Sequence, residues 1–271
     1  MTSTQSHTIA IDEPEGDRPS GIPSFKASGP RISLRGVRKT FGSIEALRGV
    51  DLDIFPGECV GLIGDNAAGK STLTKIISGT YVPDAGSISV DGETVRFSNP
   101  SDARERNIEM VFQDLSLCDH IDVMGNLFLG REVSRWSFLD RRTMREHARQ
   151  MLDDLDIRIP RLTAKVEQLS GGQRQAIAIA RAASFEPRVL IMDEPTSALA
   201  VAEVEAVLRL INEVKSRGVA VILITHRLQD LFKVCDRIAV MYEGTKVAER
   251  SIENTSLEDL VKLIVGKGEA I

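Results

Sequence analysis

Short runs in which apolar and polar residues alternate dominate the chain between about residues 30 and 100. This alternation has the two-residue period of a half-buried β-strand, and it appears at 32–37 and 46–55. Two further short runs, 87–90 and 94–97, are separated by Asp91-Gly92, a dipeptide that favours a two-residue hairpin turn. The pattern predicts an antiparallel β layer in this part of the chain.

The second half of the chain has two other patterns. Residues 189–192 and 219–224 are continuous apolar runs, as expected of strands buried on both faces of a parallel sheet. Spaced apolar positions at 140–153, 173–184 and 201–217 predict helices. We therefore predict strand, helix and strand in succession, which is typical of an α/β fold.

Composition limits the class of protein. The chain has 271 residues, of which 42% are hydrophobic and 27% charged, and this profile is that of a globular protein. Residues 1–29 are poor in large apolar side chains and are predicted to form a flexible tail, which leaves 30–271 as one folded unit. A net charge of −5 argues against nucleic acid as the main partner.

Two further features bear on location. The longest apolar stretches, such as 219–224, are far shorter than the roughly 20 residues of a membrane-spanning helix, so we expect no span in this chain. Cys59, Cys118 and Cys235 are widely separated and form no metal-binding pair, which favours a reducing compartment.

A glycine-rich stretch follows the strand-like run 59–63 and precedes a helical pattern at 71–78. In such a loop, backbone N–H groups surround phosphate oxygens, the lysine reaches the terminal phosphates and the serine hydroxyl offers an oxygen to Mg²⁺. The stretch consists of Gly64, Asp65, Asn66, Ala67, Ala68, Gly69, Lys70 and Ser71, and Thr72 follows it. We predict that these residues bind a nucleotide.

Two adjacent carboxylates, Asp193 and Glu194, end the apolar run at 189–192. The carboxyl ends of strands are where open α/β sheets bind ligands. Asp193 is suited to bind Mg²⁺, and Glu194 is suited to polarise the water that attacks a γ-phosphate.

A second candidate anion site lies at the start of the helix at 173–184. Ser170 is placed as its N-cap, and Gly171 and Gly172 precede Gln173 and leave backbone amides bare. One chain thus contains two half-sites, which hints that a complete site combines halves from two subunits.

These three motifs, in this order, resemble the ATP-binding subunit of an ABC transporter, over about residues 32–244. The resemblance implies a P-loop NTPase cassette with a mainly parallel core sheet, an antiparallel β subdomain and a helical subdomain at roughly 114–184. It implies that ATP is sandwiched in a head-to-tail dimer between the phosphate loop of one subunit and residues 170–173 of the other.

The resemblance also implies roles for three single residues. Gln113 would be the Q-loop residue that senses Mg²⁺ and the permease, and His226, at the end of a strand, would contact the γ-phosphate. Phe41 matches the aromatic residue that stacks on adenine, with a filler of a small core as the alternative. Residues 113–117 and 126–132 look like those of monosaccharide importers.

The implied partners are transmembrane permease subunits, a second ATP-binding subunit and, indirectly, a solute-binding protein. The chain would then lie peripherally at the cytoplasmic face of the inner membrane. Two departures stand out. In the D-loop, residues 197–200, Ala200 replaces the usual aspartate, which puts communication between the two sites in doubt. In the glycine-rich stretch, Ala67 replaces a common glycine, and the alanine is tolerated if its φ is negative.

Two alternatives remain open. One is an ABC-type ATPase that serves DNA repair or translation, although the chain has neither a long insert between Gln113 and Ser170 nor a second cassette. The other is a nucleotide-gated subunit that does not hydrolyse ATP, which Ala200 leaves open.

Overall fold

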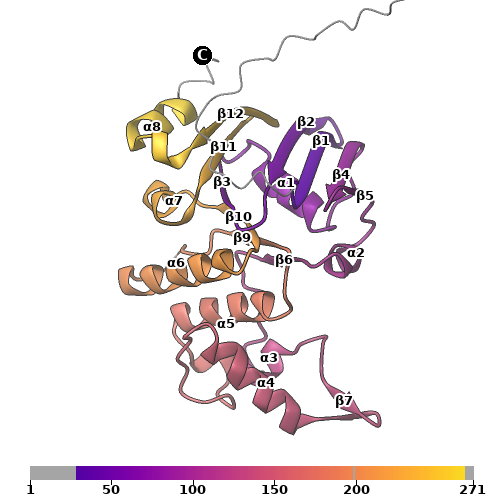
Figure 1. Cartoon of the computed structure of the whole chain (residues 1–271), viewed down its shortest axis with the longest axis vertical. Coiled ribbons are helices and arrows are strands. Elements are labelled where there is room, and N and C mark those ends of the chain that lie inside the picture. Colours follow the sequence, from indigo (N-terminus) through magenta and orange to yellow (C-terminus); the bar gives the residue numbers. More distant parts are fainter. Residues whose placement is uncertain (1–28, 198, 266–271) are drawn as a thin grey trace, which may run out of the picture.

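A six-stranded sheet, mainly parallel, forms the centre of the molecule (Figure 1). The computed structural model describes residues 29–197 and 199–265, so the predicted tail, 1–29, lies outside the described part except for its last residue. Only β12 runs antiparallel to its neighbour. In order across the sheet, the strands are β12 (Thr245–Ser251), β11 (Arg237–Tyr242), β3 (Cys59–Ile63), β10 (Ala220–Ile224), β9 (Val189–Asp193) and β6 (Ile108–Val111).

The central strands divide their side chains between two hydrophobic cores. In β9, Val189 and Ile191 point into one core, and Leu190 and Met192 point into the other. All four are fully buried, because helices or a second sheet cover both faces. This two-sided burial explains why the runs at 189–192 and 219–224 are continuously apolar, and it confirms the predicted parallel core.

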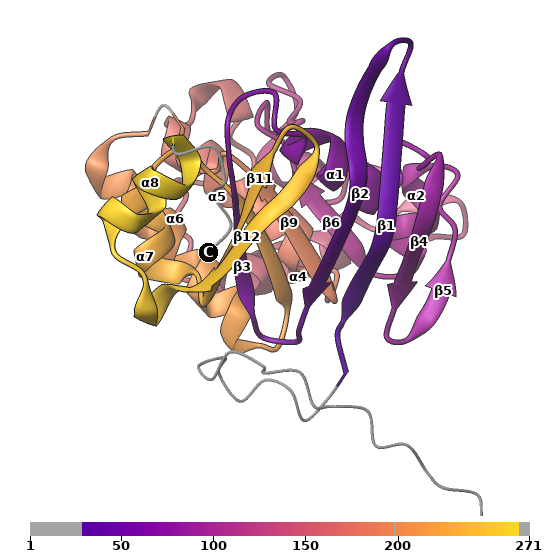
Figure 2. The same cartoon turned by 90° about the horizontal axis from the view of Figure 1, so that it is seen from above.

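A second sheet of four antiparallel strands packs over one face of the central sheet (Figure 2), with α1 (Lys70–Ile77) contributing to the shared core. Asp91 and Gly92 have φ values of 50° and 82°, as the predicted two-residue hairpin turn requires. The second strand of this hairpin ends at Val95, earlier than predicted, because the chain turns to bury Phe97 and to start α2 (Pro100–Glu105). The strand order is β2 (Ile44–Ile54), β1 (Ile32–Phe41), β4 (Ala85–Val90) and β5 (Glu93–Val95).

The opposite end of the molecule is helical (Figure 1). Asp140 caps the predicted helix there, accepting a hydrogen bond from the N–H of Thr143, and the helix buries one side chain on each turn. The elements are α3 (Val123–Leu127), the hairpin β7 (Ser134–Arg135) and β8 (Phe138–Leu139), α4 (Arg141–Asp153), a 3₁₀ turn (Val166–Gln168) and α5 (Gly171–Ala183). They lie within 114–184, and the boundaries of a helical subdomain there stay a prediction.

The remaining helices cover the second face of the central sheet. The predicted helix α6 (Val201–Ser216) packs between that sheet and α5. It is followed by α7 (Leu228–Val234), a 3₁₀ turn (Ile252–Asn254) and α8 (Leu257–Val265). In the part of the chain that the structure describes, no helix is both long and apolar enough to cross a membrane.

Candidate active site

The loop between β3 and α1 needs glycine at two positions. Gly64 and Gly69 have φ values of 143° and 95°, and a Cβ at these positions would lie 2.1 Å from the carbonyl oxygen of Met241 and 2.6 Å from that of Ala46. Any side chain there would displace the neighbouring backbone. Ala67 is not among the residues with positive φ, so the methyl group in place of a glycine hydrogen causes no backbone strain, as predicted.

Lys70, the first residue of α1, has its side chain folded back over this loop. Its Nζ donates hydrogen bonds to the carbonyl oxygens of Gly64 and Asp65, both at 2.7 Å. Burial lowers the pKa of Lys70, while the negative charges of Asp65, Asp193 and Glu194 act in the opposite direction. A phosphate would offer the ammonium group charged partners, which form stronger hydrogen bonds than two neutral carbonyls.

Two carboxylates face this lysine from the end of β9. Burial and the charge of Glu194 raise the pKa of Asp193, and the ammonium groups of Lys75 and Lys70 only partly oppose the shift. Burial and the neighbouring charge thus both disfavour the ionised form of Asp193. A cation bound beside Asp193 would offset both effects.

The three predicted catalytic residues meet at Glu194. Its Oε1 lies 3.2 Å from Nδ1 of His226, and its Oε2 accepts a hydrogen bond of 3.5 Å from Nε2 of Gln113. The three residues follow β9, β10 and β6, which are neighbours in the sheet and run parallel, so their carboxyl ends meet at one edge. Glu194 itself has a φ of 50°, a strained conformation of the kind that clusters at functional sites.

Phe41 ends β1 and is 41% exposed, so it is not the filler of a small core. Its ring meets that of Tyr81 edge to face, with 5.1 Å between centroids, and Nζ of Lys39 lies 5.4 Å from its centroid. An exposed ring held from two sides is a ready stacking surface. Sequence reasoning missed Tyr81, which no motif marks.

The predicted second anion site opens α5. Ser170 is its N-cap, as predicted, and it also forms a capping box with Gln173. The amides there are not all bare, however, because the N–H of Gly172 donates a hydrogen bond of 3.1 Å to Oε1 of Glu203 in α6. Sequence reasoning missed Glu203. Its position three residues after Ala200 matches the acidic end of a capping box whose usual cap residue is absent here.

The two candidate sites are separate hollows of the surface. One is lined by residues 64–67 of the phosphate loop together with Thr225 and His226. The other is lined by Ser170, Gly172 and Gln173 with residues of α4 and α6. The two hollows have no lining residue in common. The two predicted anion sites thus lie in different hollows, and their roles as halves of one composite site stay a prediction.

Comparison with known proteins gives the same picture. Residues 47–197 match the model of the ABC transporter family. The chain is 45% identical to the xylose/arabinose import ATP-binding protein XylG of Sulfolobus acidocaldarius, over 86% of this chain and 93% of that protein. It is 41% identical to the fructose import ATP-binding protein FrcA of Rhizobium meliloti, over 90% and 96% of the two chains.

A third relative differs in length. The ribose import ATP-binding protein RbsA 2 of Burkholderia cenocepacia is 42% identical over 87% of this chain, but the match spans only 47% of that protein. The chain thus covers about half the length of this relative.

Solved structures agree with the fold. A nucleotide-free ATP-binding cassette of an ABC transporter superposes with a TM-score of 0.75 at 25% identity, over 88% of this chain and 95% of that one. A dimeric cassette in a post-hydrolysis state, bound to ADP and phosphate, has a TM-score of 0.70 at 27% identity, over 83% and 100% of the chains. The predicted fold class is confirmed, and the chain belongs to the ABC transporter family, as an ATP-binding cassette that hydrolyses ATP.

Proposed function

We propose that this cassette hydrolyses ATP between two head-to-tail subunits to drive the import of a monosaccharide through separate permease subunits. The observation that carries the proposal is the meeting of Gln113, Glu194 and His226 at the sheet edge. Glu194 orients and polarises the attacking water, and His226 and Gln113 hold the two oxygens of its carboxylate in place. Lys70 binds the terminal phosphates from the other side.

Mg²⁺ fits the residues beside Glu194. The hydroxyl of Ser71, the carboxylate of Asp193 and the side-chain amide oxygen of Gln113 are hard oxygen donors, which this ion prefers. Burial and the charge of Glu194 raise the pKa of Asp193, and a cation at this place would stabilise its ionised form. When bound, the ion would neutralise charge on the phosphates during transfer.

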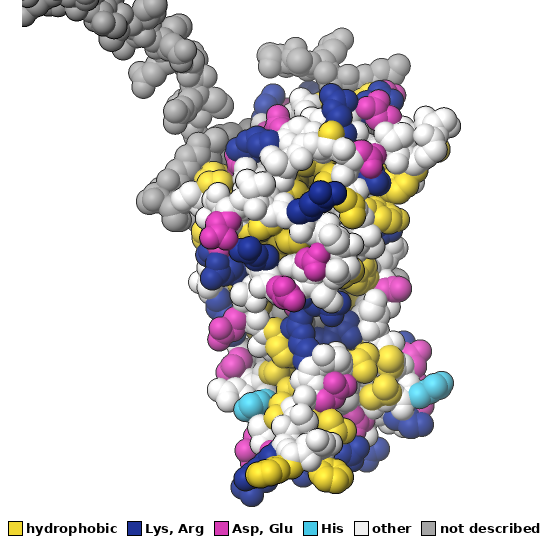
Figure 3. Space-filling model, turned by 90° about the vertical axis from the view of Figure 1, so that its right-hand side faces the viewer, with side chains coloured by type: hydrophobic (Ala, Val, Ile, Leu, Met, Phe, Trp, Pro, Cys, Tyr) yellow, Lys and Arg dark blue, Asp and Glu magenta, His cyan; other side chains and the backbone are white. Residues whose placement is uncertain are grey.

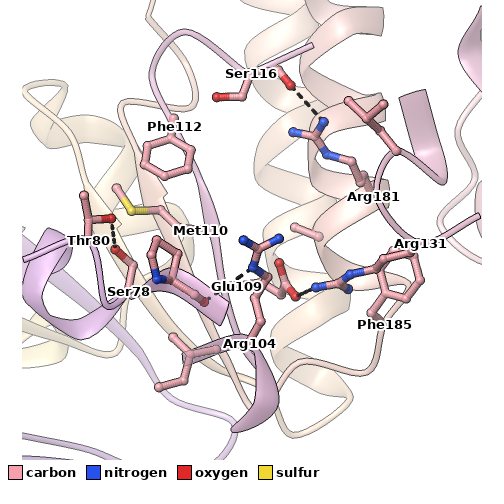
Figure 4. Close-up of a pocket in the computed structure, with 14 residues that line it drawn as sticks. Ser78, Thr80, Arg104, Glu109, Met110, Phe112, Ser116, Arg131, Arg181 and Phe185 are labelled. Atoms are coloured by element: carbon pink, nitrogen blue, oxygen red, sulfur yellow. Dashed lines mark hydrogen bonds and ion pairs between the residues drawn. The ribbon is translucent and has the colours of Figure 1, made fainter. Parts of the chain in front are cut away.

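A groove of about 230 Å³ between α2 and the end of α5 is our candidate for the surface that contacts the permease (Figure 4). Its lining includes Phe112, just before Gln113, and Ser116, just after it. Arg181 donates hydrogen bonds of 2.9 and 2.8 Å to the carbonyl oxygens of Leu115 and Ser116. Arg131 forms an ion pair with Glu109 and stacks over Phe185 in the same groove. Basic side chains gather at mid-height on the side of the molecule that Figure 3 presents.

A permease segment seated in this groove would touch the chain that leads directly to the catalytic centre. Phe112 and Ser116 line the groove and lie on either side of Gln113 in the sequence. Movement of this segment would therefore displace the side chain of Gln113, which bonds to Glu194. We propose that the chain lies peripherally at the cytoplasmic face of the membrane, with a solute-binding protein on the other side of the permease.

The solute is assigned from the relatives. The three relatives described above are import ATP-binding proteins for xylose and arabinose, for fructose and for ribose. All of these are monosaccharides, so we assign the same solute class to this chain.

The test is uptake of radiolabelled monosaccharides by cells that lack the chain, with the wild type or Glu194→Gln restored. We expect the wild type to restore uptake and Glu194→Gln to reduce hydrolysis by about 10³-fold, since the variant keeps the shape of the side chain but loses the base. The Glu205→Gln variant, in the exposed ion pair with Lys233, is the matched control. Normal turnover by Glu194→Gln would remove Glu194 from its role, and normal uptake without the chain would exclude transport.

A further inference from the structure

A single carboxylate connects the start of α5 with the start of α6. Glu203 accepts hydrogen bonds from the N–H of Gly172 at Oε1, 3.1 Å, and from the N–H of Ala200 at Oε2, 3.2 Å. A hydrogen bond from the hydroxyl of Ser170, together with these two N–H groups, lowers the pKa of Glu203. The carboxylate therefore stays charged and bonded to both segments near neutral pH.

Close packing reinforces this connection. A Cβ added to Gly172 would lie 2.7 Å from Cγ of Glu203, and one added to Gly171 would lie 3.3 Å from Cδ2 of Leu199. The two glycines thus let α5 approach the other segment more closely than side chains would allow. A shift at the start of α5 acts on Glu203 and Leu199 together.

The segment that receives this shift begins at the catalytic glutamate, which precedes Ala200 by six residues. The N–H and the hydroxyl of Ser197 donate hydrogen bonds of 3.1 and 2.9 Å to the carbonyl oxygen of Glu194. The neighbouring Thr196 is fixed by a hydrogen bond of 2.6 Å to Asp230. The backbone of Glu194 is thus bonded to Ser197, three residues before Ala200, and Glu203 ties Ala200 to α5.

We propose that Glu203 is a positioning residue that couples the serine-glycine-glycine motif of each subunit to Glu194 of the same subunit. Ala200 has a methyl group, which accepts no hydrogen bond, so the D-loop lacks its usual carboxylate. Glu203 supplies a carboxylate beside it. The proposal rests on the paired arrangement proposed above. When residues 170–172 of one subunit meet the γ-phosphate held by its partner, Glu203 transmits that contact to its own catalytic centre, so the two sites turn over cooperatively.

The test is Glu203→Gln in the full chain, assayed with its permease for ATP turnover against ATP concentration. Glutamine has one acceptor oxygen in place of two, so it cannot satisfy both N–H groups. We expect kcat to fall about 10-fold and the Hill coefficient to approach about 1, while the affinity of the isolated subunit for a non-hydrolysable ATP analogue changes less than about 2-fold.

Two further variants separate coupling from helix capping. Ala200→Ser restores a side-chain cap to α6 without a carboxylate, so Ala200→Ser/Glu203→Gln recovers thermal stability but not turnover if Glu203 couples the sites. Recovery of turnover in this double variant would reduce Glu203 to a cap and overturn the proposal. Glu205→Gln, two residues further along α6, is the control for loss of a charge.

The remaining outcomes distinguish this proposal from the proposed function. A cooperative wild type with an equally active and equally cooperative Glu203→Gln variant would overturn the role of Glu203 alone. A wild type that hydrolyses ATP with a Hill coefficient of about 1 would overturn the coupling of the sites, whereas hydrolysis by a wild type that stays monomeric at saturating ATP would contradict the paired site and, with it, this proposal.

Discussion

The two half-sites of the molecule differ most in charge. At the phosphate loop, the ammonium group of Lys70 and the carboxylates of Asp193 and Glu194 lie close together, and the pKa values of Lys70 and Asp193 are both shifted. At the start of α5, a hydroxyl and backbone amides are available, and one of those amides is already bonded to the protein's own carboxylate, Glu203. We therefore expect the first half-site to bind a nucleotide by itself, because one amide of the second is already bonded to a carboxylate of the protein.

The difference suggests a division of labour. Helix N-termini bind anions through oriented N–H groups. A carboxylate of the protein that already bonds to one of these groups leaves fewer free N–H groups for a bound phosphate. The start of α5 is therefore suited to contact a phosphate that another subunit already binds. Variants at the two half-sites should separate affinity from turnover.

The largest expected effect comes from Lys70→Ala. Removal of the ammonium group takes away the charge-assisted hydrogen bonds to the terminal phosphates, and we expect the affinity of the isolated subunit for Mg-ATP to fall about 100-fold or more. Ser170→Ala, at the other half-site, should leave this affinity within about 2-fold. Isothermal titration calorimetry on the two variants measures both values.

Equal losses in the two variants would contradict the division of labour, because they would mean that one subunit binds ATP with both half-sites. Arg142→Ala, which breaks an exposed ion pair with Glu146 in α4 and lines neither hollow, is the control for loss of a positive charge.

A smaller effect is expected from Phe41→Ala, which removes the ring proposed to stack on adenine. Stacking of a base on an aromatic side chain contributes about 1 to 3 kcal/mol, so we expect ATP affinity to fall about 10-fold, with Phe41→Tyr close to the wild type. Ile44→Ala alters another exposed apolar side chain of the same hairpin and is the matched control. A loss of inorganic triphosphate binding in Phe41→Ala would argue against a role limited to the base.

The motifs carried most of what the sequence predicted correctly. Glycine at 64 and 69, serine at 170 and the Asp91-Gly92 turn each have a local backbone requirement that the residue type reveals. The continuous apolar runs revealed strands buried on both faces, because burial on two sides leaves no polar position. These features depend on neighbours in the sequence and can be predicted from it.

Features that depend on distant segments were less accessible. Short strands such as β6 have too few residues for a clear period, and the strand order that brings Gln113, Glu194 and His226 together arises only in the folded sheet. Their convergence was implied by family resemblance alone. Glu203 went unnoticed because its partner Gly172 lies 31 residues earlier and no local pattern links the two.

The smallest expected effect concerns the raised pKa of Asp193, at the end of β9 beside the phosphate loop. The pKa of Asp193 is raised in the folded protein, so the stability linked to its protonated form is present below its unfolded pKa and is lost as pH rises through the raised value. Asp193→Asn removes this charge. Without nucleotide, we expect the variant to melt about 1 to 2 °C above the wild type at neutral pH, a small shift because solvent screens the partly exposed group.

Melting curves between about pH 4 and pH 8 test this sign, since the difference between variant and wild type should shrink toward the acid end. Mg-ATP should reverse the order, because ligand binding stabilises the wild type by mass action and the variant lacks the carboxylate proposed to bind the ion. A variant that melts below the wild type at every pH, with and without Mg-ATP, would show that Asp193 stabilises the fold directly. Charge would then contribute less to nucleotide binding at the phosphate loop than the comparison of the two half-sites requires.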